Sequence, residues 1–590
     1  MFPGGDQLSL THEVLLESIP AHLRQYVVEQ NYERYTPRDQ AVWRYIMRKN
    51  LNFLSRHAHP AYISGLRQTG ISPEKIPDVL EMNRVMKNIG WSAVVVNGFI
   101  PPAAFMEFQA NRILVISAEM RTIEHILYTP APDIVHEAAG HAPIIADEAY
   151  AEYLQRFGEY GSRAIASKLD FNVYEAIRRL SIIKEYPYAT EKEIQTAEQK
   201  LNDIIAKNTI PSEATKLSRL HWWTVEYGLV GSPSEFKLYG AGLLSSVGES
   251  QKCLESEVKK VPLDVTCVET DYDITQMQPQ LFVAEDWSHL VQVLEEYADN
   301  MCFRRGGTES LRQAIESENV ATAVLSSGIQ ISGVFVNMLT DTAGIPVYLQ
   351  TRGKTALACA DKELEGHDTD THNDGFGSPV GKLVGKQKPF ELWSDQELNE
   401  YGIKMDQKTA LTFQSGITVT GRVKKIERCN TRIILISFID CLVRDQKGSI
   451  LFQPQWGRYD MAVGAEITSV FAGSADKQKF NVLPAKSEAI AIDVHYDEQT
   501  NTLFKLYDDV RKYRQKEHKT GAEMEAVYRQ LCSDFNNEWL IRLELLELTA
   551  QSRNDEELGK KLRSDLKRLV DTSSEFNQLI KDGIDLLTHT

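Results

Sequence analysis

Cysteine is scarce in this chain, which has 590 residues and only 7 cysteines. Their number is odd and no two of them form a C-x-x-C pair. The sequence therefore predicts neither a disulfide framework nor a thiolate zinc site. Such sparse cysteine is typical of a reducing compartment, so we expect a cytoplasmic protein.

Long apolar runs are also missing. The strongest candidate, RIILISFIDCLV, is interrupted by Asp440, whereas a membrane-spanning helix needs roughly 18 or more apolar residues in succession. The first residues, MFPGGDQLSLTHEV, lack the basic segment followed by an apolar one that marks a secretory signal. We therefore expect neither a membrane span nor secretion.

Positive charge is in deficit, because 65 lysines and arginines stand against 82 acidic residues and the net charge is -17. Nucleic acids and anionic membranes are bound through clustered positive charge, so neither is an expected partner. The composition is otherwise ordinary, with 42% hydrophobic and 25% charged residues. It indicates a globular protein with room for several domains.

Three regions differ in the spacing of their apolar residues. Up to about residue 315 the spacing is helical, as in QAVWRYIMRKNLNFLSRHA (40–58). Short β-branched runs separated by turn residues follow, and then the helical spacing returns. We predict a mainly α domain over 1–315, a β-rich domain of unknown role over 320–500, and a helical carboxy-terminal region over 501–590.

Two histidines stand five positions apart in HEAAGH, residues 136–141. In the zinc-protease pattern H-E-x-x-H they are four apart, which disfavours a zinc hydrolase with Glu137 as its base. Five residues along an ideal helix turn a side chain by about 140°. On a continuous α-helix the two imidazoles would therefore point apart. Both could reach one metal if a short helix, capped by Asp133, ended near Gly140. The alternative is a chance pair of histidines that cap backbone carbonyls.

A third metal ligand must come from elsewhere in the chain, and Glu226 is the best candidate. It lies in IPSEATKLSRLHWWTVEYGL (210–229), a predicted helix that Ser212 could cap and Gly228 could end. A carboxylate on an aromatic-rich helix is costly unless it is paired or metal-bound. Two imidazoles suit zinc, iron or copper. The alternative for Glu226 is an ion pair with a base such as Arg219.

Two longer motifs carry a resemblance to a known family. YTPAPDIVHEAAGHAP (128–143) resembles the iron-binding segment of the pterin-dependent aromatic amino acid hydroxylases. WWTVEYGL (222–229), followed by YGAGLLSSVGE (239–249), resembles the second signature of that family. The resemblance covers residues 30–305 and implies the family's mainly α catalytic domain, in the bacterial form without an amino-terminal regulatory domain.

This resemblance implies a monooxygenase that hydroxylates the ring of a free aromatic amino acid with O2, iron(II) and tetrahydrobiopterin or a related tetrahydropterin. The implied iron ligands are His136, His141 and Glu226, and Glu137 is the implied catalytic residue. The implied amino acid pocket consists of Arg121, Thr129, Trp222, Ser245 and Ser246, with the Arg121 guanidinium suited to a carboxylate. The implied pterin contacts are Gly98, Phe99, Ile100, Phe105 and Glu137.

The expected substrate is L-phenylalanine, which would be converted to L-tyrosine, with tryptophan second. Trp222 is typical of the phenylalanine and tyrosine enzymes, and the apolar Ile274 at the pocket edge offers a tyrosine hydroxyl no partner. His221 stands where the family usually has tyrosine, which bears on oxygen activation. The remaining alternative is a catalytically inactive protein that binds pterin or amino acid.

The second half of the chain carries no recognised motif, and two hypotheses are open for it. The last helices place Leu562, Leu569, Phe576 and Leu579 near heptad spacing, which would suit a homo-oligomer formed through these helices. The β-rich domain could instead be a module that senses a ligand or tethers a partner.

Overall fold

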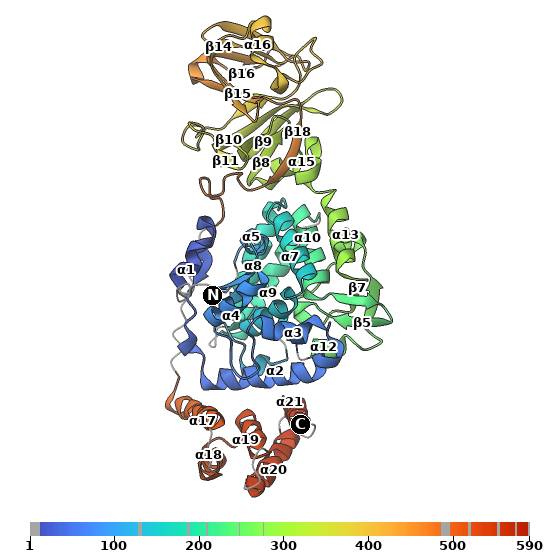
Figure 1. The fold of residues 1–590 in the computed structure, drawn as a ribbon, viewed down its shortest axis with the longest axis vertical. Coiled ribbons are helices and arrows are strands. Elements are labelled where there is room, and N and C mark those ends of the chain that lie inside the picture. The colour runs from blue at the N-terminus through green and yellow to red at the C-terminus, as the bar shows by residue number, and fades with distance from the viewer. Residues whose placement is uncertain are drawn as a thin grey trace, which may run out of the picture.

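The computed structural model describes residues 12–98, 100–127, 132–185, 189–207, 210–246, 248–274, 276–484, 496–516, 521–550, 555–572 and 575–587. Three parts are stacked along the long axis of the molecule (Figure 1). A β-rich part lies at one end, a helical body lies in the middle, and a group of carboxy-terminal helices lies at the other end. Among the described helices, none combines the length and the apolarity that a bilayer span requires.

The middle body is mainly helical and carries two small sheets, with strand orders β1-β2-β3 and β5-β4-β7-β6. Its α-helices are α1 (His12–Glu17), α2 (Pro37–His57), α3 (Ala61–Gln68), α4 (Val79–Met86), α5 (Pro102–Ala110), α6 (Ala142–Ile145), α7 (Glu148–Gly161), α8 (Lys168–Glu185), α9 (Glu191–Ile205), α10 (Glu213–His221), α11 (Ala241–Ser245), α12 (Glu249–Lys252) and α13 (Trp287–Ala298). Two π-helices, η5 (Val135–His141) and η6 (Trp222–Glu226), lie among them. The strands are β1 (Val27–Val28), β2 (Ser92–Val96), β3 (Ile113–Ser117), β4 (Leu229–Ser232), β5 (Glu235–Leu238), β6 (Lys259–Pro262) and β7 (Gln280–Ala284).

Helix α2 spans 21 residues and forms the edge of this body that faces the carboxy-terminal helices. Its start is fixed by Thr36 and Asp39, whose side chains each accept a hydrogen bond from the other residue's backbone N–H, and by Pro37 at the first helical position. Charged residues on α2 are buried as well as apolar ones, including Arg44 and Lys49. Because buried charges require partners, α2 must be covered by another part of the chain.

The β-rich part contains two antiparallel sheets. The first has the order β11-β10-β9-β8-β18, with β12 also paired to β10, and the second has the order β13-β14-β15-β16, with β17 also paired to β15. The elements are β8 (Val320–Leu325), β9 (Ile329–Thr340), β10 (Pro346–Cys359), β11 (Lys362–Glu363), β12 (Gly377–Pro379), α16 (Asp395–Tyr401), β13 (Lys408–Thr412), β14 (Thr418–Cys429), β15 (Arg432–Arg444), β16 (Ile450–Phe452), β17 (Tyr459–Ala462) and β18 (Ile467–Ala472).

Two helices that begin inside the predicted 1–315 domain pack with the β-rich part. These are α14 (Cys302–Arg305) and α15 (Gly307–Ser317). Leu311 and Ala314 belong to the same apolar cluster as residues of β8, β9 and β18. Helical spacing reveals which face of a helix is buried but not which neighbour buries it, so the sequence could not show this packing.

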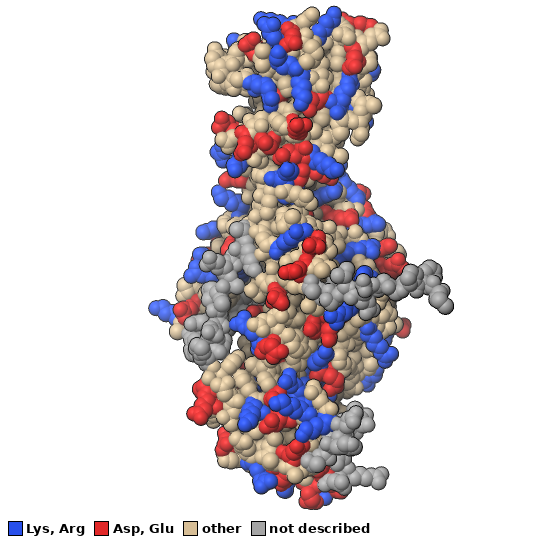
Figure 2. Space-filling view, turned by 60° about the vertical axis from the view of Figure 1, so that its left-hand side comes forward, with Lys and Arg blue, Asp and Glu red and all other residues tan. Residues whose placement is uncertain are grey.

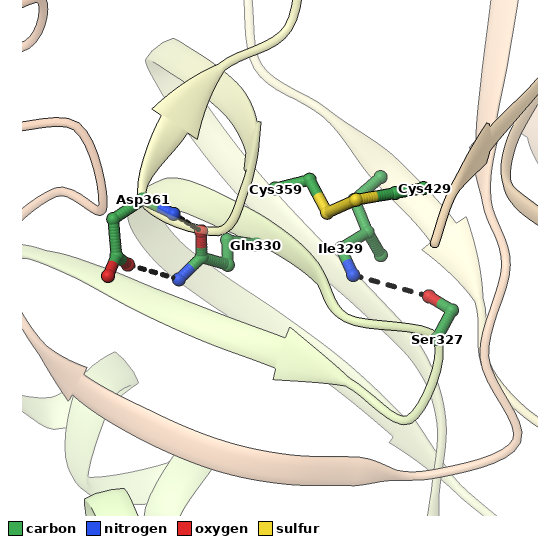
Figure 3. The surroundings of a disulfide bond; sticks show 6 residues. All are labelled: Ser327, Ile329, Gln330, Cys359, Asp361 and Cys429. Atoms are coloured by element: carbon green, nitrogen blue, oxygen red, sulfur yellow. Dashed lines mark hydrogen bonds between the residues drawn. A yellow bond between two sulfur atoms is a disulfide. The ribbon is translucent and has the colours of Figure 1, made fainter. Parts of the chain in front are cut away.

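A disulfide joins Cys359, at the end of β10, to Cys429, at the end of β14 (Figure 3). The sequence predicted no disulfide framework, and the other five cysteines are indeed free, but this single pair was not expected. The two cysteines are separated by 70 positions, and they meet only because the two sheets bring their strand ends together. No local spacing signals such a pair.

The carboxy-terminal helices are α17 (Glu498–Gln515), α18 (Gly521–Asp534), α19 (Leu540–Ala550), α20 (Glu556–Thr572) and α21 (Asn577–Leu586). Leu562, Leu569 and Leu579 are buried in the core that also contains α2, and Phe576 packs against that core. The apolar face that heptad spacing assigned to another subunit is thus covered within the chain itself.

Ion pairs connect these helices to α2. The Arg44 guanidinium donates two hydrogen bonds to the Glu544 carboxylate, at 2.6 and 2.7 Å, and both side chains are buried. Arg38 binds Glu538 at 3.0 Å, and the Tyr45 hydroxyl donates to the Leu579 carbonyl at 2.7 Å. The buried charges of α2 therefore find their partners in the last hundred residues of the chain.

Acidic and basic side chains are interspersed on the face of the molecule shown in Figure 2. No continuous basic surface covers the described residues on that face.

Glu544→Ala should lower the free energy of unfolding by about 3–5 kcal/mol, because it leaves the Arg44 guanidinium buried without its carboxylate. Chemical denaturation followed by circular dichroism measures the change. Glu81→Ala, in the exposed Lys75–Glu81 pair, is the matched control and should cost less than about 1 kcal/mol. Equal effects of the two substitutions would show that the buried pair does not stabilise the docked helices.

Candidate metal centre

The two histidines of HEAAGH lie on the π-helix η5, whose backbone hydrogen bonds link residue i to residue i+5. This wider turn returns a side chain to nearly the same side of the helix after five residues, where an α-helix would not. The Nε2 atoms of His136 and His141 consequently lie 3.2 Å apart. The expected helix end near Gly140 is absent, since η5 continues through His141 directly into α6.

Gly140 has a packing role in this arrangement. A Cβ atom at this position would lie 2.6 Å from the carbonyl oxygen of Ala241. Only glycine therefore lets η5 approach the start of α11 this closely. The approach also brings the end of α11, with Ser245, against the ring of His136.

Glu226 closes the cluster from the second π-helix, η6. Its carboxylate oxygens lie 3.2 Å from His136 Nε2 and 3.3 Å from His141 Nε2. Ligands that share one face of an octahedron at about 2.1 Å from a metal lie roughly 3 Å apart. The three donors therefore fit one metal ion, and two histidines with one carboxylate are the donor set of non-haem iron(II) sites.

Ser245 determines which nitrogen of His136 is free to bind a metal. The Ser245 Oγ–H donates to the Ala241 carbonyl at 2.8 Å, and the same oxygen lies 3.0 Å from His136 Nδ1. Because the hydroxyl hydrogen is already used, Nδ1–H of His136 is the donor of the second bond. The lone pair is then on Nε2, which faces His141 and Glu226.

Two further ionisable side chains border the cluster. Burial raises the pKa of Glu137 to about 8, and its Oε2 has no hydrogen-bond partner among the described residues. Burial lowers the pKa of His221 to about 4, and its Nδ1 lies 3.8 Å from Glu226 Oε1. Burial would also raise the pKa of Glu226, but His141 and His136 outweigh it and hold that pKa well below its ordinary range.

Arg121 is buried and bound to Asp133. Its Nε and Nη2 donate to the two carboxylate oxygens at 2.7 and 2.8 Å, while Nη1 lies 3.4 Å from the Ser245 carbonyl. Asp133 also accepts the backbone N–H of His136 at 3.0 Å, which is the predicted cap. Sequence reasoning missed the bond between Arg121 and Asp133, because no regular spacing marks a pair twelve positions apart in irregular backbone.

Trp222, on the same π-helix as Glu226, belongs to an aromatic wall. Its ring is stacked on Tyr272, with centroids 4.3 Å apart and an interplanar angle of 11°, and lies 4.6 Å from the ring of Tyr227. Its indole N–H donates to the Gln278 side chain at 3.3 Å. The half-buried Ile274 lies between Tyr272 and Gln278 in the sequence.

Four of the remaining predicted site residues lie in the described part of the chain. Phe105 is half-buried, with its ring 6.1 Å from that of His221. Gly98 has a positive φ of 58° and Ile100 packs on the core beside the first sheet. Ser246 accepts the backbone N–H of Glu249 at 3.1 Å. The predicted residues Phe99 and Thr129 lie outside the described residues.

Comparison with known proteins identifies a family for the part of the chain that contains the cluster. A family model described as biopterin-dependent aromatic amino acid hydroxylase matches residues 24–170 and 186–314. This part of the chain belongs to that family. We call residues 24–314 the hydroxylase region. The match ends before β8, so it leaves the β-rich part and the carboxy-terminal helices unassigned.

Several phenylalanine-4-hydroxylases are similar to the chain. That of Chromobacterium violaceum is 27% identical over 268 residues, which are 45% of this chain and 75% of that protein. That of Ralstonia nicotianae is 29% identical over 268 residues, 45% of this chain and 72% of that protein. The chain is accordingly a phenylalanine-hydroxylase-like enzyme, with the likeness confined to the hydroxylase region.

Solved structures of the Chromobacterium violaceum phenylalanine hydroxylase also match. One contains iron(III) and oxidised 7,8-dihydrobiopterin, is 26% identical, and aligns with a TM-score of 0.37 over 47% of this chain and 88% of that one.

Ser245→Ala should weaken iron(II) binding about 10- to 100-fold, because it removes the partner that holds His136 Nδ1 and orients the ring. Competition with a chromophoric chelator measures the affinity. Ser246→Ala is the matched control, since that hydroxyl caps Glu249 rather than His136, and it should leave the affinity unchanged. The same affinity in both variants would show that Ser245 does not orient the ligand.

Proposed function

We propose that the chain hydroxylates the ring of free L-phenylalanine to give L-tyrosine, using O2, a tetrahydropterin and iron(II). The observation that carries the proposal is the convergence of His136, His141 and Glu226, 3.2–3.3 Å apart, inside the region that the family model matches. A complete ligand set disfavours the alternative of an inactive binding protein, since binding alone has no need of all three donors.

His136, His141 and Glu226 would hold the iron through Nε2, Nε2 and the carboxylate oxygens. Iron bound there supplies, together with the tetrahydropterin, the redox chemistry that activates O2. The chain's own contribution is to place the reactants and exclude water. All three ligands are largely buried, with 3–19% of their side-chain surface exposed, which keeps the centre dry.

Glu137 is suited to the pterin side of the centre. Its Oε2 has no hydrogen-bond partner among the described residues, so it can accept a hydrogen bond from an N–H group of the pterin. Its Oε2 is 3.8 Å from His141 Nε2, so a pterin bound to Glu137 would lie beside the metal. Tetrahydrobiopterin or a related tetrahydropterin fits this role.

Arg121 is suited to bind the carboxylate of the amino acid. Asp133 accepts from Nε and from one N–H of Nη2, and one N–H of Nη1 is directed at the Ser245 carbonyl, which leaves one N–H each of Nη1 and Nη2 for a ligand. The same Asp133 caps the start of η5. The carboxylate of the substrate and the imidazole of His136 would therefore be positioned by one shared side chain.

The aromatic wall of Trp222 and Tyr272 and the apolar Ile274 favour phenylalanine. A ring hydroxyl placed against these residues would lose its hydrogen bonds with water without replacement. Tryptophan remains the second candidate substrate, because an apolar wall accepts an indole ring as well. Stacking on the wall would contribute about 0.5–1.5 kcal/mol beyond area burial.

The proposal is tested by incubating the full-length chain with iron(II), tetrahydrobiopterin, O2 and each aromatic amino acid in turn. Tyrosine formed from phenylalanine should exceed hydroxytryptophan formed from tryptophan, and tyrosine should be the poorest substrate. Glu226→Ala is the matched control and should lose both iron and turnover. Hydroxylation that is independent of Glu226, or no hydroxylation by an iron-loaded chain, would contradict the assignment.

Arg121→Lys should raise the KM for the amino acid about tenfold or more, because a lysine keeps the charge near Asp133 but cannot form the forked bond to a carboxylate. Steady-state kinetics at saturating pterin measure the change. The iron content, measured in the same preparation, should equal that of the unmodified chain. A KM that does not change would remove Arg121 from the amino acid pocket.

A further inference from the structure

A second group of metal-binding side chains lies in the β-rich part. His367 and His372 stand in the connection between β11 and β12, and Asp460 stands on β17. All three residues are buried, and their ligand atoms lie within 4.8 Å of one another. Within the described residues, this cluster and the iron centre are the two groups with such a geometry.

The two histidines repeat the arrangement of the iron centre. They too are five positions apart in the sequence, and His367 Nδ1 lies 3.1 Å from His372 Nε2. At the iron centre the corresponding distance between His136 and His141 is 3.2 Å. The second pair is held by backbone pairing rather than by a π-helix, since Leu357 N–H donates to the His367 carbonyl at 2.9 Å and Thr355 N–H to the His372 carbonyl at 3.1 Å.

Glu427 determines the tautomer of His367. Its Oε1 lies 3.1 Å from His367 Nε2 and 2.9 Å from the Lys425 ammonium. A carboxylate only accepts hydrogen bonds when it is ionised, so Nε2 of His367 carries the hydrogen and Nδ1 presents its lone pair to the cluster. A histidine that donates one N–H to a carboxylate and directs the other nitrogen at a metal is a common arrangement in metal sites.

Asp460 supplies the third donor from the other sheet. Its Oδ2 lies 3.9 Å from His367 Nδ1 and accepts a hydrogen bond from Arg458 Nε at 3.0 Å. Its Oδ1 accepts a hydrogen bond from the Ser437 hydroxyl on the neighbouring strand β15. A carboxylate oxygen can accept this bond from Arg458 and still bind a metal through its second lone pair.

We propose that His367, His372 and Asp460 bind one zinc(II) ion, at a site distinct from the iron centre. Two neutral imidazoles and a carboxylate are a zinc donor set, with a fourth position for water. The histidines are carried by the sheet that contains β10 and β11, and Asp460 by the sheet that contains β15. The ion would therefore hold the two sheets together, as the Cys359–Cys429 disulfide does between β10 and β14 (Figure 3).

The competing arrangement is a hydrogen-bonded chain without metal, in which His372 Nε2–H donates to His367 Nδ1 and His367 Nε2–H to Glu427. His372→Gln separates the two arrangements, because a glutamine amide can still donate to His367 Nδ1 but is a poor zinc ligand. His289→Gln, outside both clusters, is the matched control. All variants are made in the full-length chain. Each is also combined with Glu226→Ala, so that zinc bound at the iron centre does not add to the number of zinc ions measured per chain.

Zinc content is measured after equilibrium dialysis against a zinc buffer. The full-length chain and its His289→Gln variant should each bind one equivalent more than His372→Gln, in the presence or absence of Glu226→Ala. Zinc should also raise the midpoint of thermal unfolding of Glu226→Ala, but not of Glu226→Ala with His372→Gln. Equal zinc content with and without His372→Gln would overturn the proposal in favour of the hydrogen-bonded chain.

Cobalt(II) gives a readout that does not depend on the folding of the His372→Gln variant. Titration of the Glu226→Ala chain with cobalt(II) should produce visible absorption bands that saturate at one equivalent and disappear when zinc is added. Absence of a saturable band at one equivalent would equally overturn the proposal.

Discussion

The wide turn of η5 is the constraint on which the hydroxylase region depends. Five residues separate His136 from His141, and only i→i+5 backbone bonding places both Nε2 atoms within 3.2 Å of each other on a continuous helix. Glu226 reaches them from a second π-helix. Such a backbone is rarer than an α-helix, so the surrounding contacts have to hold it. Asp133 caps its start, Gly140 lets α11 approach, and Ser245 on α11 fixes His136.

Helix α2 links the hydroxylase region to the carboxy-terminal helices. Helix α2 lies between the hydroxylase core and the carboxy-terminal helices, and its buried Arg44 is neutralised by Glu544. A buried arginine without that partner would carry a desolvation cost of several kcal/mol. The carboxy-terminal helices are therefore part of the packing of α2, and Leu562, Leu569 and Leu579 contribute to the same core. Their near-heptad spacing reflects packing inside one chain.

Sequence reasoning singled out His136, His141 and Glu226 because they lie in long motifs whose residue types suit one chemistry, and the structure brings their donor atoms to 3.2–3.3 Å from one another. It missed the backbone that makes the set possible, since hydrophobic periodicity does not distinguish a π-turn from the end of an α-helix. It also missed the contacts of Arg121 with Asp133 and of Cys359 with Cys429. Such pairs depend on tertiary structure, and no local spacing encodes them.

Two histidines are also five positions apart in HDTDTH, residues 367–372. There, however, the spacing alone did not indicate a metal site. In HEAAGH the surrounding sequence predicts a helix. Two histidines five positions apart would point in different directions on an α-helix, so their spacing drew attention to the local backbone and to a shared metal. The Gly, Asp and Asn content of residues 363–382, which include HDTDTH, predicts a long exposed loop, in which any spacing is permitted. Only the folded β-rich part reveals that both histidines of this loop are buried and that Glu427 orients His367. It also brings a carboxylate oxygen of Asp460, which is distant in the sequence, within 4.8 Å of the ligand nitrogens of both histidines. When two candidate ligands lie on a loop, their spacing is not diagnostic. The third donor and the carboxylate that orients a histidine come from distant strands, so such a site becomes visible only in the folded structure.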